Sequence, residues 1–475
     1  MPRLVIVSNR TADPRKTAAG GLAVALGPAL EQTGGLWFGW SGRIVGDETP
    51  HETLVKPQLR TSGRVTLATV DLTKTDHDNF YLGYSNSVLW PVFHYRLDLA
   101  DFRTDFLQGY LHVNRRFAQA LLPLLRDDDL IWVHDYHLIP LAAELRSFGC
   151  KQRIGFFLHI PMPPPLILAA LPAHDWLLHS LFAYDVVGMQ SEADSAHFAR
   201  FVRTEAKAQA LPHRRFHAFG RTLHADAFPV GIDIGEFRAL CAADEAMDTW
   251  RNMCNEYAKR RLLVGVDRLD YSKGLPQRMQ AFHELLRRFP EQRSSATLIQ
   301  IASPSRQAVD AYSQIRTQLE LLCGSINGEY GELDWMPVRY LHRTMSRRRL
   351  PGLYRASRVG LVTPLRDGMN LVAKEYVVAQ DPDNPGVLVL SRFAGAAEQL
   401  HEALLVNPYD IPATADAIER ALRMPVAERI ERHRALLDHI ERHDVRWWLR
   451  NFLAALRGDE VEQPQLRAVG ERRRV

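Results

Sequence analysis

The chain has 475 residues, 46% of them hydrophobic and 24% charged, and a formal net charge of +4. This composition is ordinary for a globular protein and excludes disordered and fibrous classes. The length suits two domains of roughly 200 residues each. Because the charge is nearly balanced and basic residues are interleaved with acidic ones, we expect no nucleic-acid partner.

No apolar run in the sequence approaches the roughly 18 residues that a membrane helix needs. The apolar segment Leu4–Val7 is followed by polar Ser8, so the N-terminal stretch lacks a signal-peptide core and a cleavage site. We therefore expect a cytoplasmic protein that makes no membrane contact. The four cysteines show no CxxC spacing, which argues against a zinc site and against a disulfide framework.

Short apolar strands alternate with helical stretches twice along the chain, which is the pattern of doubly wound α/β domains. In the first half, strands are predicted at Leu4–Val7, Trp37–Trp40, Leu130–Val133, Ile154–His159, Val186–Met189 and Phe228–Gly231. In the second half they are predicted at Leu262–Val266, Leu298–Ile301, Val338–Leu341, Gly360–Thr363, Val387–Leu390 and Leu404–Val406. Helical periodicity is clearest at Gly109–Leu125, Pro276–Arg288, Val309–Leu322 and Thr414–Met424.

The polar, helical stretch Ala242–Tyr257 separates the two series, so we place a domain boundary near residue 240. This gives an N-terminal domain of residues 1–240 and a C-terminal domain of residues 241–444. Residues 445–457 carry Trp447 and Trp448 and are expected to form a helix that packs back across both domains, and residues 458–475 to form a frayed polar tail. Two such domains leave a cleft at the carboxyl ends of both sheets, where ligands of this fold class bind.

The segment Pro364–Tyr376 is the most informative in the chain. It follows a buried strand, Gly368 and Asn370 supply turn chemistry, and a helix begins at Leu371. The free amides and the dipole at such a helix start suit a diphosphate. The carboxylates of Asp367 and Glu375 can only accept hydrogen bonds and suit sugar hydroxyls. The alternative is that they are an ordinary turn residue and a solvated helix charge.

Two cations, Arg268 and Lys273, lie in the loop that follows the predicted strand Leu262–Val266. Arginine can fork onto a phosphate, and lysine can neutralise it as a point charge. The structural alternative is a surface pair between Arg268 and Asp270. We favour phosphate binding, because this loop and the Asp367 segment follow strands of the same predicted sheet.

Arg10 follows the first strand, and the pair Gly20-Gly21 before Leu22 would let backbone amides approach a phosphate closely. A glycine pair alone is weak evidence, and GxGxxG and Walker A spacings are absent from this stretch. The turn Ala302–Arg306 also follows a strand, and its arginine suits a second phosphate.

His134, Asp135 and His137 end one predicted strand, and His159 ends another. Such residues could be metal ligands, a catalytic pair or satisfied core groups. We favour the core interpretation for His134 and His137 and a functional one for Asp135 and His159. No DxD motif accompanies a strand end, so we expect neither a metal nor a cofactor.

Several ordered stretches resemble glycosyltransferase family 20, from about Leu4 to about Leu453. The similar stretches are Val7–Arg10, Gly20–Leu22, Trp37–Trp40, Val88–Pro91, His134–Leu138, Phe157–Pro161, Arg268–Gly274 and Arg366–Glu375. The resemblance implies a GT-B fold, with two Rossmann-like domains facing across a cleft. It also implies transfer of glucose from UDP-glucose to glucose 6-phosphate with retention of configuration.

The resemblance also assigns roles to residues. Donor binding falls to Gly21, Leu22, Arg268, Lys273, Asp367, Gly368, Met369, Asn370, Leu371, Val372 and Glu375. Acceptor binding falls to Arg10, Trp40, Tyr81, Trp90, Asp135 and Arg306. The catalytic set is Asp135, His159, Arg268, Lys273 and Asp367.

No carboxylate here is an evident nucleophile, so a front-face mechanism is expected, and the family's aromatic residue after His-Ile-Pro is replaced by Met162. We also expect a homo-oligomer. Three alternatives stay open: a family relative with another acceptor or nucleotide donor, an inactive sensor of sugar phosphates, and a related nucleotide-sugar epimerase. The sensor is disfavoured because Asp367, Arg268 and Lys273 are all present.

Overall fold

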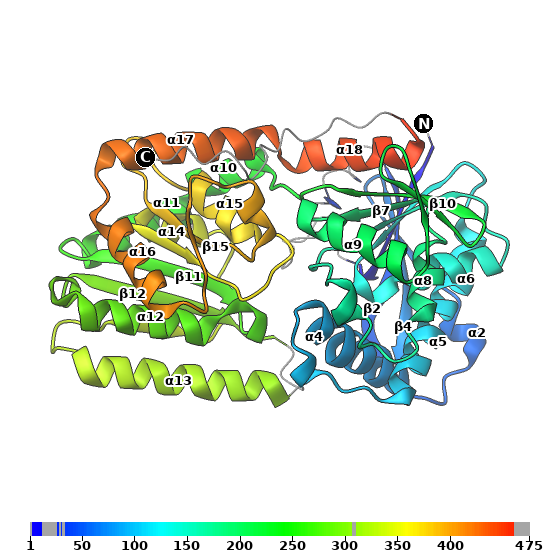
Figure 1. The fold of residues 1–475 in the computed structure, drawn as a ribbon, viewed down its shortest axis with the longest axis horizontal. Coiled ribbons are helices and arrows are strands. Elements are labelled where there is room, and N and C mark those ends of the chain that lie inside the picture. Colours follow the sequence, from blue (N-terminus) through cyan, green and yellow to red (C-terminus); the bar gives the residue numbers. More distant parts are fainter. Residues whose placement is uncertain (1, 12–25, 28–29, 31–33, 306–309, 460–475) are drawn as a thin grey trace.

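The computed structural model describes residues 2–11, 26–27, 30, 34–305 and 310–459, which form two α/β lobes (Figure 1). Each lobe is built on one sheet whose central strands are parallel. The predicted pair of doubly wound domains is confirmed. No helix in these ranges is long and apolar enough to cross a membrane.

The first sheet has ten strands in the order β3-β4-β2-β1-β5-β6-β7-β10-β9-β8. They are β1 Leu4–Arg10, β2 Gly35–Val45, β3 Gln58–Ser62, β4 Val65–Thr73, β5 Leu130–His134, β6 Arg153–Phe157, β7 Val186–Met189, β8 Gln209–Leu211, β9 Arg215–Ala218 and β10 Arg221–Ala227. The strands from β4 to β10 pair in parallel, and the edge strands pair antiparallel. Both faces of the parallel part are covered, which explains the continuous apolar runs.

The second sheet has six parallel strands in the order β13-β12-β11-β14-β15-β16. They are β11 Arg261–Arg268, β12 Ala296–Ser303, β13 Val338–Leu341, β14 Val359–Val362, β15 Val387–Ser391 and β16 Leu404–Val406. Each contains or closely matches a predicted strand.

Helices cover both faces of each sheet. The first lobe has α2 His51–Leu54, α3 Lys74–Asp76, η1 His77–Leu89, α4 Trp90–Phe93, η2 Leu97–Leu99, α5 Thr104–Leu121, η3 Leu122–Leu124, η4 Tyr136–Leu138, α6 Leu141–Ser147, α7 Pro165–Leu168, α8 Asp175–Leu181 and α9 Glu192–Thr204. The second has α10 Ile234–Ala242, α11 Asp244–Glu256, η5 Tyr271–Lys273, α12 Leu275–Arg288, η6 Pro290–Gln292, α13 Asp310–Tyr330, α14 Leu350–Ala356, α15 Leu371–Val378, η7 Gly395–Glu398 and α16 Ile411–Arg423. Two more, α17 Val426–Arg442 and α18 Val445–Arg457, close the described chain.

One predicted strand is wrong. Phe228–Gly231 is not a strand, because β10 ends at Ala227 and an irregular segment follows. Phe228 and Val230 are buried although this segment pairs with no strand. Its sequence therefore has the apolar character of a strand without forming one. The strand predicted at Ile154–His159 ends at Phe157. The hairpin formed by β3 and β4 was not predicted.

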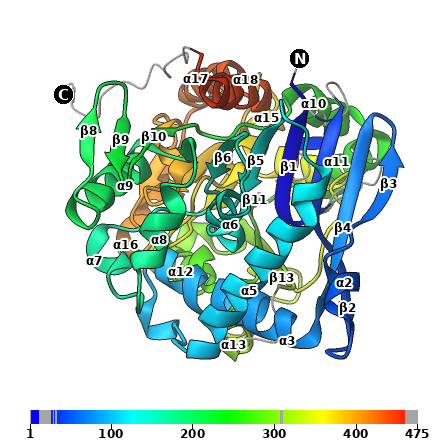
Figure 2. The same cartoon turned by 90° about the vertical axis from the view of Figure 1, so that its right-hand side faces the viewer.

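The chain crosses between lobes twice. After β10 it enters α10, which contacts α11, α14 and α15 of the second lobe, so the predicted boundary near residue 240 falls inside this helix. Helix α17 packs on α15, and α18 returns to β6 and β7 of the first sheet (Figure 1). Figure 2 shows the two helices nearly end-on, one behind the other. The helix predicted at residues 445–457 thus contacts the first sheet, while α17 covers the second lobe.

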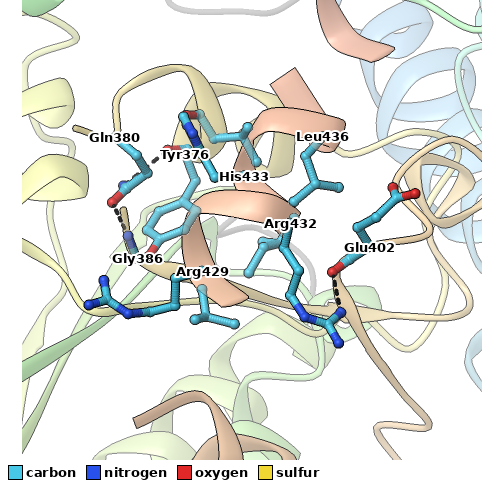
Figure 3. Close-up of a pocket in the computed structure, with 11 residues that line it drawn as sticks. Tyr376, Gln380, Gly386, Glu402, Arg429, Arg432, His433 and Leu436 are labelled. Carbon is cyan, nitrogen blue, oxygen red and sulfur yellow. Dashed lines mark hydrogen bonds between the residues drawn. The ribbon is translucent and has the colours of Figure 1, made fainter. Parts of the chain in front are cut away.

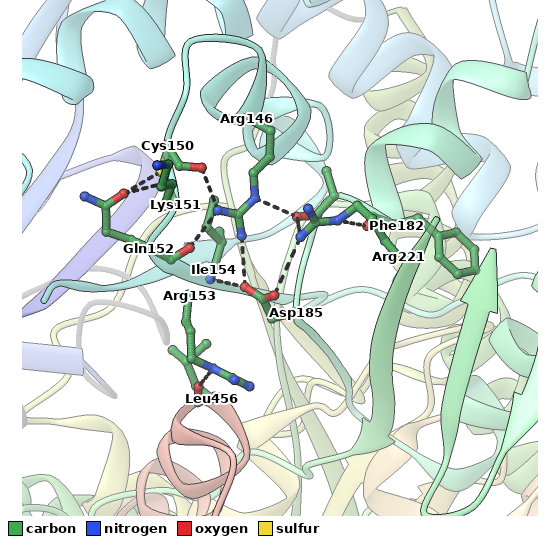
Figure 4. A network of polar contacts seen from close by, with 11 residues as sticks. Arg146, Cys150, Lys151, Gln152, Arg153, Ile154, Phe182, Asp185, Arg221 and Leu456 are labelled. Atoms are coloured by element: carbon green, nitrogen blue, oxygen red, sulfur yellow. Dashed lines mark hydrogen bonds and ion pairs between the residues drawn. The ribbon is translucent and has the colours of Figure 1, made fainter. Parts of the chain in front are cut away.

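A polar network fixes the strand that leads to His159 (Figure 4). The carboxylate of Asp185 accepts hydrogen bonds from the Ile154 amide at 2.7 Å and from Nη2 of Arg146 at 3.0 Å. Arg221 lies 3.6 Å from the other carboxylate oxygen. At the first residue of β6, Nε of Arg153 donates to the Leu456 carbonyl of α18 at 2.5 Å. Strand β6 is therefore tied to α6, β10 and α18.

We expect Asp185→Ala to lower the free energy of unfolding by about 1–3 kcal/mol, because Arg146 and the Ile154 amide would lose their shared acceptor. Urea denaturation followed by circular dichroism measures this. The matched control is Asp248→Ala, which breaks an exposed pair with Arg251 and should cost at most about 1 kcal/mol. Equal midpoints for the two variants would contradict the assigned role of Asp185.

Candidate active site between the two lobes

The loops that follow β5 and β6 in the first lobe meet the loop that follows β14 in the second. A Cβ atom built on Gly368 would lie 2.2 Å from the carbonyl oxygen of His159, so only glycine permits this approach. Nearby, the guanidinium carbon of Arg268 lies 5.5 Å from the ring centroid of Trp90. The predicted strand-end loops of the two sheets therefore adjoin one another.

An ion pair lies at the centre of the second-lobe side. Nζ of Lys273, after β11, lies 2.5 Å from Oδ2 of Asp367, after β14, and both side chains are nearly buried. Nδ2 of Asn370 donates to the same oxygen at 2.9 Å. The backbone of Asp367 is held by Phe393, whose carbonyl accepts its amide at 3.1 Å. A cation suited to phosphate and a carboxylate suited to hydroxyls are thus side by side.

Helix α15 begins directly after this pair. Asn370 adopts φ 75°, a left-handed conformation that asparagine tolerates better than most residues. It turns the chain into α15. The amides of Leu371 and Val372 stand in the first turn of this helix, where an N–H group has no partner within the helix itself. The positive end of the helix dipole and these amides favour an anion beside Lys273.

Two neighbouring charged residues on α15 are shielded from water, Lys374 fully and Glu375 partly. Burial raises the pKa of Glu375 to about 7, and nearby Arg347 opposes that rise. Lys374 is 1% exposed, and its Nζ donates to the carbonyl of Val230 at 2.7 Å. Burial lowers the pKa of Lys374 to about 7. The lysine ties α15 to the crossing segment between the lobes.

On the first-lobe side, Asp135 and His159 contact each other. Asp135 has φ 75°, and its Oδ1 accepts the backbone amide of His159 at 3.2 Å. Nε2 of His159 lies 3.1 Å from Nδ1 of His134. Burial lowers the pKa of His159 to about 3, so its ring is neutral at pH 7.

Arg10, Trp40 and Tyr81 form a second group in the first lobe. The guanidinium carbon of Arg10 lies 5.7 Å from the Trp40 ring, and Trp40 and Tyr81 are 5.8 Å apart between ring centroids. Tyr81 lies on η1, a π-helix, a rare element that recurs at functional sites. His77, one turn earlier, contacts both aromatic rings. The sequence offered no signal for His77, which belongs to no motif.

Comparison with known proteins decides the family. The model of glycosyltransferase family 20 matches residues 5–458. The chain belongs to glycosyltransferase family 20. It is 50% identical over 457 residues to a trehalose-6-phosphate synthase of Sinorhizobium fredii, covering 95% of this chain and 98% of the relative. A trehalose-6-phosphate synthase of Klebsiella pneumoniae is 48% identical over 458 residues, covering 96% and 95%.

Solved structures of the family agree. A UDP-forming α,α-trehalose-phosphate synthase from Burkholderia xenovorans in complex with glucose-6-phosphate matches with a TM-score of 0.91 and 50% identity, over 96% of this chain and 100% of that chain. An E. coli structure bound with UDP-2-fluoro glucose matches with a TM-score of 0.91 and 47% identity, over 97% and 100%. The fold is the GT-B fold of these enzymes.

Most family-derived site residues fall on these loops, and Trp90 of the first lobe lies beside Arg268 of the second. Gly21, Leu22 and Arg306 lie outside the described residues. His134 and His137 are buried, as the core interpretation predicts. Within the described ranges, no group of three or more His, Cys, Asp or Glu side chains is arranged to hold a metal ion.

A cavity between α15, β15 and α17 is a packing gap rather than a second site (Figure 3). Apart from the Glu402 carboxylate, its polar lining side chains are bonded within the protein. Nε2 of Gln380 donates to the carbonyl of Tyr354 at 2.8 Å, and its Oε1 accepts the Gly386 amide at 2.9 Å. Arg432 donates to the carbonyl of Glu402 at 2.8 Å. None of the predicted site residues lines this cavity.

Glu398 of η7 links the second lobe to the first, and sequence reasoning missed it. Its carboxylate accepts the amides of Glu192 at 2.8 Å and Ala193 at 3.1 Å, the first two residues of α9. An anion at a helix start is stabilised by the dipole. Nη2 of Arg366, in the loop after β14, lies 3.6 Å from Oδ1 of Asp194 in the same helix. These contacts hold the two lobes together beside Asp367.

We expect Glu398→Ala to speed hydrogen exchange of the α9 N-terminal peptide about fivefold, because losing a helix cap costs about 1 kcal/mol. Mass spectrometry of deuterated peptides measures this. Glu402→Ala is the control, since the Glu402 carboxylate makes no hydrogen bond or ion pair with the described residues. Unchanged exchange in Glu398→Ala would show that the contact between lobes does not protect the helix.

Proposed function

We propose that this chain transfers glucose from UDP-glucose to glucose 6-phosphate, giving α,α-trehalose 6-phosphate and UDP with retention of configuration. The relatives named above support the reaction, and two solved relatives are bound to glucose-6-phosphate and to UDP-2-fluoro glucose. A third similar structure comes from work on glycosyltransfer with retention by trehalose-6-phosphate synthase.

The second lobe is proposed to hold the donor. Arg268, Lys273, the α15 amides and the Gly21-Leu22 loop would bind the diphosphate. Glu375 would accept hydrogen bonds from the ribose hydroxyls. Asp367, with Gly368, Met369 and Asn370 of the same loop, would bind the hydroxyls of the transferred glucose. The first lobe would hold the acceptor through Arg10, Trp40, Tyr81, Trp90 and Asp135, together with Arg306. Asp135 and His159 would orient the acceptor and the donor glucose.

The proposed reaction exchanges one bond at the donor C1 atom. The bond from C1 to the β-phosphate oxygen of UDP-glucose breaks, and C1 bonds to the anomeric hydroxyl oxygen of glucose 6-phosphate. The acceptor proton passes to the leaving phosphate oxygen, so that UDP forms. Arg268 and Lys273 would stabilise the charge that grows on that phosphate.

The observation that carries the proposal is the ion pair of Lys273 and Asp367 beside the contact of Gly368 with His159. A phosphate-binding cation and a hydroxyl-binding carboxylate adjoin each other where the two lobes touch. Asp367 is already engaged by Lys273 and Asn370, which supports sugar binding rather than nucleophilic attack. Donor and acceptor could then meet only between the lobes.

We expect UDP affinity to rise with pH between about pH 6 and 8, because the pKa of Glu375 is raised to about 7 and the ionised carboxylate accepts ribose hydrogen bonds more strongly. Glu375→Gln should lower the affinity about tenfold at pH 8 and remove this part of the pH dependence. Calorimetric titration of the wild type and of Glu375→Gln with UDP at several pH values measures this difference. Protonation of UDP itself affects both proteins equally. Parallel pH profiles would contradict the ribose role.

The same raised pKa predicts an opposite effect on stability. Between pH 4.5 and 7 the folded state binds more protons at Glu375 than the unfolded state, so this residue lowers stability progressively as pH rises through that window. Glu375→Gln should therefore stabilise the ligand-free protein at pH 8, as thermal unfolding would show. A loss of stability would mean that Glu375 has a structural role.

We expect Arg306→Ala to raise KM for glucose 6-phosphate by about tenfold or more and to leave UDP affinity within a few-fold, because a charged contact to phosphate contributes about 1.5–3 kcal/mol. Unphosphorylated glucose should be a very poor acceptor for the wild type. Steady-state assays of UDP release measure both, with Arg251→Ala as a surface control. Equal use of glucose and glucose 6-phosphate, or weakened UDP binding, would contradict the acceptor assignment.

A further inference from the structure

His134 and His159 form a hydrogen-bonded pair of imidazoles behind the candidate site. His134 ends β5 and is fully buried, and its Nδ1 lies 3.1 Å from Nε2 of His159. The ring centroids are 5.3 Å apart. His159 is partly exposed, and its Nδ1 makes no hydrogen bond with the described residues. One imidazole therefore lies in the core, and the other lies where the lobes meet.

Aromatic side chains surround the pair. The ring of Trp132 lies 4.6 Å from that of His134. Trp448 of α18 lies 6.4 Å from His134 and 6.2 Å from His159, and it also packs on Trp132 at 4.9 Å. Phe157 contacts both histidines. The last described helix of the chain thus supports two rings beside the candidate site.

Both imidazoles are neutral at pH 7. Burial lowers the pKa of His134 well below its ordinary value and that of His159 to about 3. A hydrogen bond between two neutral imidazoles contains one proton, which leaves two arrangements. Either Nδ1 of His134 donates to His159, or Nε2 of His159 donates to His134.

The surroundings of Nε2 of His134 distinguish these arrangements. This atom is buried and has no hydrogen-bond partner. If His159 donated, neutral His134 would carry its proton on Nε2, a donor with no acceptor. The flanking indole nitrogens of Trp132 and Trp448 are also buried donors without partners. A bare Nε2 avoids adding a third unpartnered N–H donor to these two, so we place the proton of His134 on Nδ1, which donates a hydrogen bond to Nε2 of His159.

We propose that His134 is a positioning residue that fixes His159 in the Nδ1-protonated tautomer, so that His159 donates a hydrogen bond to a hydroxyl oxygen of the transferred glucose. The inference rests on the proposed function through the role of His159. In this tautomer both ring nitrogens of His159 are engaged, one as acceptor from His134 and one as donor to sugar. His159 then has no lone pair for the acceptor proton, in agreement with proton transfer to the leaving phosphate.

The kinetic test compares His134→Asn with His134→Leu. The asparagine amide nitrogen can occupy the position of Nδ1 and donate to His159. Leucine is similar in volume to histidine but has no hydrogen-bond donor. We expect His134→Leu to lower kcat about tenfold to a hundredfold and His134→Asn to retain most of it. KM for glucose 6-phosphate and the affinity for UDP should stay within about twofold in both. Equal losses in the two variants, or a loss shared by all three constants, would overturn the proposal.

A second readout does not depend on activity. Long-range ¹⁵N–¹H NMR of histidine-labelled protein reports the tautomer, and the His159 signals are those missing from His159→Gln. We expect an Nδ1–H pattern in the wild type and in His134→Asn, and a shift toward Nε2–H in His134→Leu. An Nε2–H pattern in the wild type would overturn the proposal even if His134→Leu failed to fold. Failure of the proposed function would appear separately, as no trehalose 6-phosphate from the wild type.

Discussion

The approach of Gly368 to the His159 carbonyl is the constraint on which the site depends. It places the loop after β14 directly against the loop after β6, and a Cβ atom at 2.2 Å from that oxygen would forbid it. Because both loops follow parallel strands, the carboxyl edges of the two sheets are brought together. The ion pair of Lys273 and Asp367, the start of α15 and the His134–His159 pair all lie next to this contact. Glu398 and α18 hold the lobes in the arrangement that makes it possible.

The electrostatics of the site follow from where charges are removed from water. Lys374 and Glu375 are neighbours on α15, and burial moves both pKa values to about 7 from opposite directions. Nζ of Lys374 donates a hydrogen bond to a backbone carbonyl between the lobes, while for Glu375 the effect of burial outweighs that of nearby Arg347, which lowers its pKa. A carboxyl group kept in this state reduces stability and is explained by a ligand that hydrogen-bonds to it. Asp367 differs from Glu375 in this respect, because its carboxylate already forms an ion pair with Lys273.

The sequence predicted the sheets well, because parallel strands covered on both faces leave apolar runs such as Leu262–Val266 and Val387–Leu390. The prediction failed at Phe228–Gly231, where the chain is buried but forms no strand hydrogen bonds. It also failed at the sheet edge, where the hairpin of β3 and β4 was missed. The site loops could be predicted because polar residues that directly follow a strand share one edge. Contacts such as Glu398 with α9 could not, because they join residues about two hundred positions apart that carry no local motif.

The central claim is that one site forms only where Gly368 lies against His159, and the variant Gly368→Ala tests it most directly. The added Cβ atom would force the loops apart while keeping the backbone amide and each sheet. Turnover of UDP-glucose with glucose 6-phosphate should fall by about a hundredfold or more, with UDP affinity changed only a few-fold. Gly328→Ala, where a Cβ meets nothing within 4 Å, should behave as wild type. Wild-type turnover in Gly368→Ala would contradict the account.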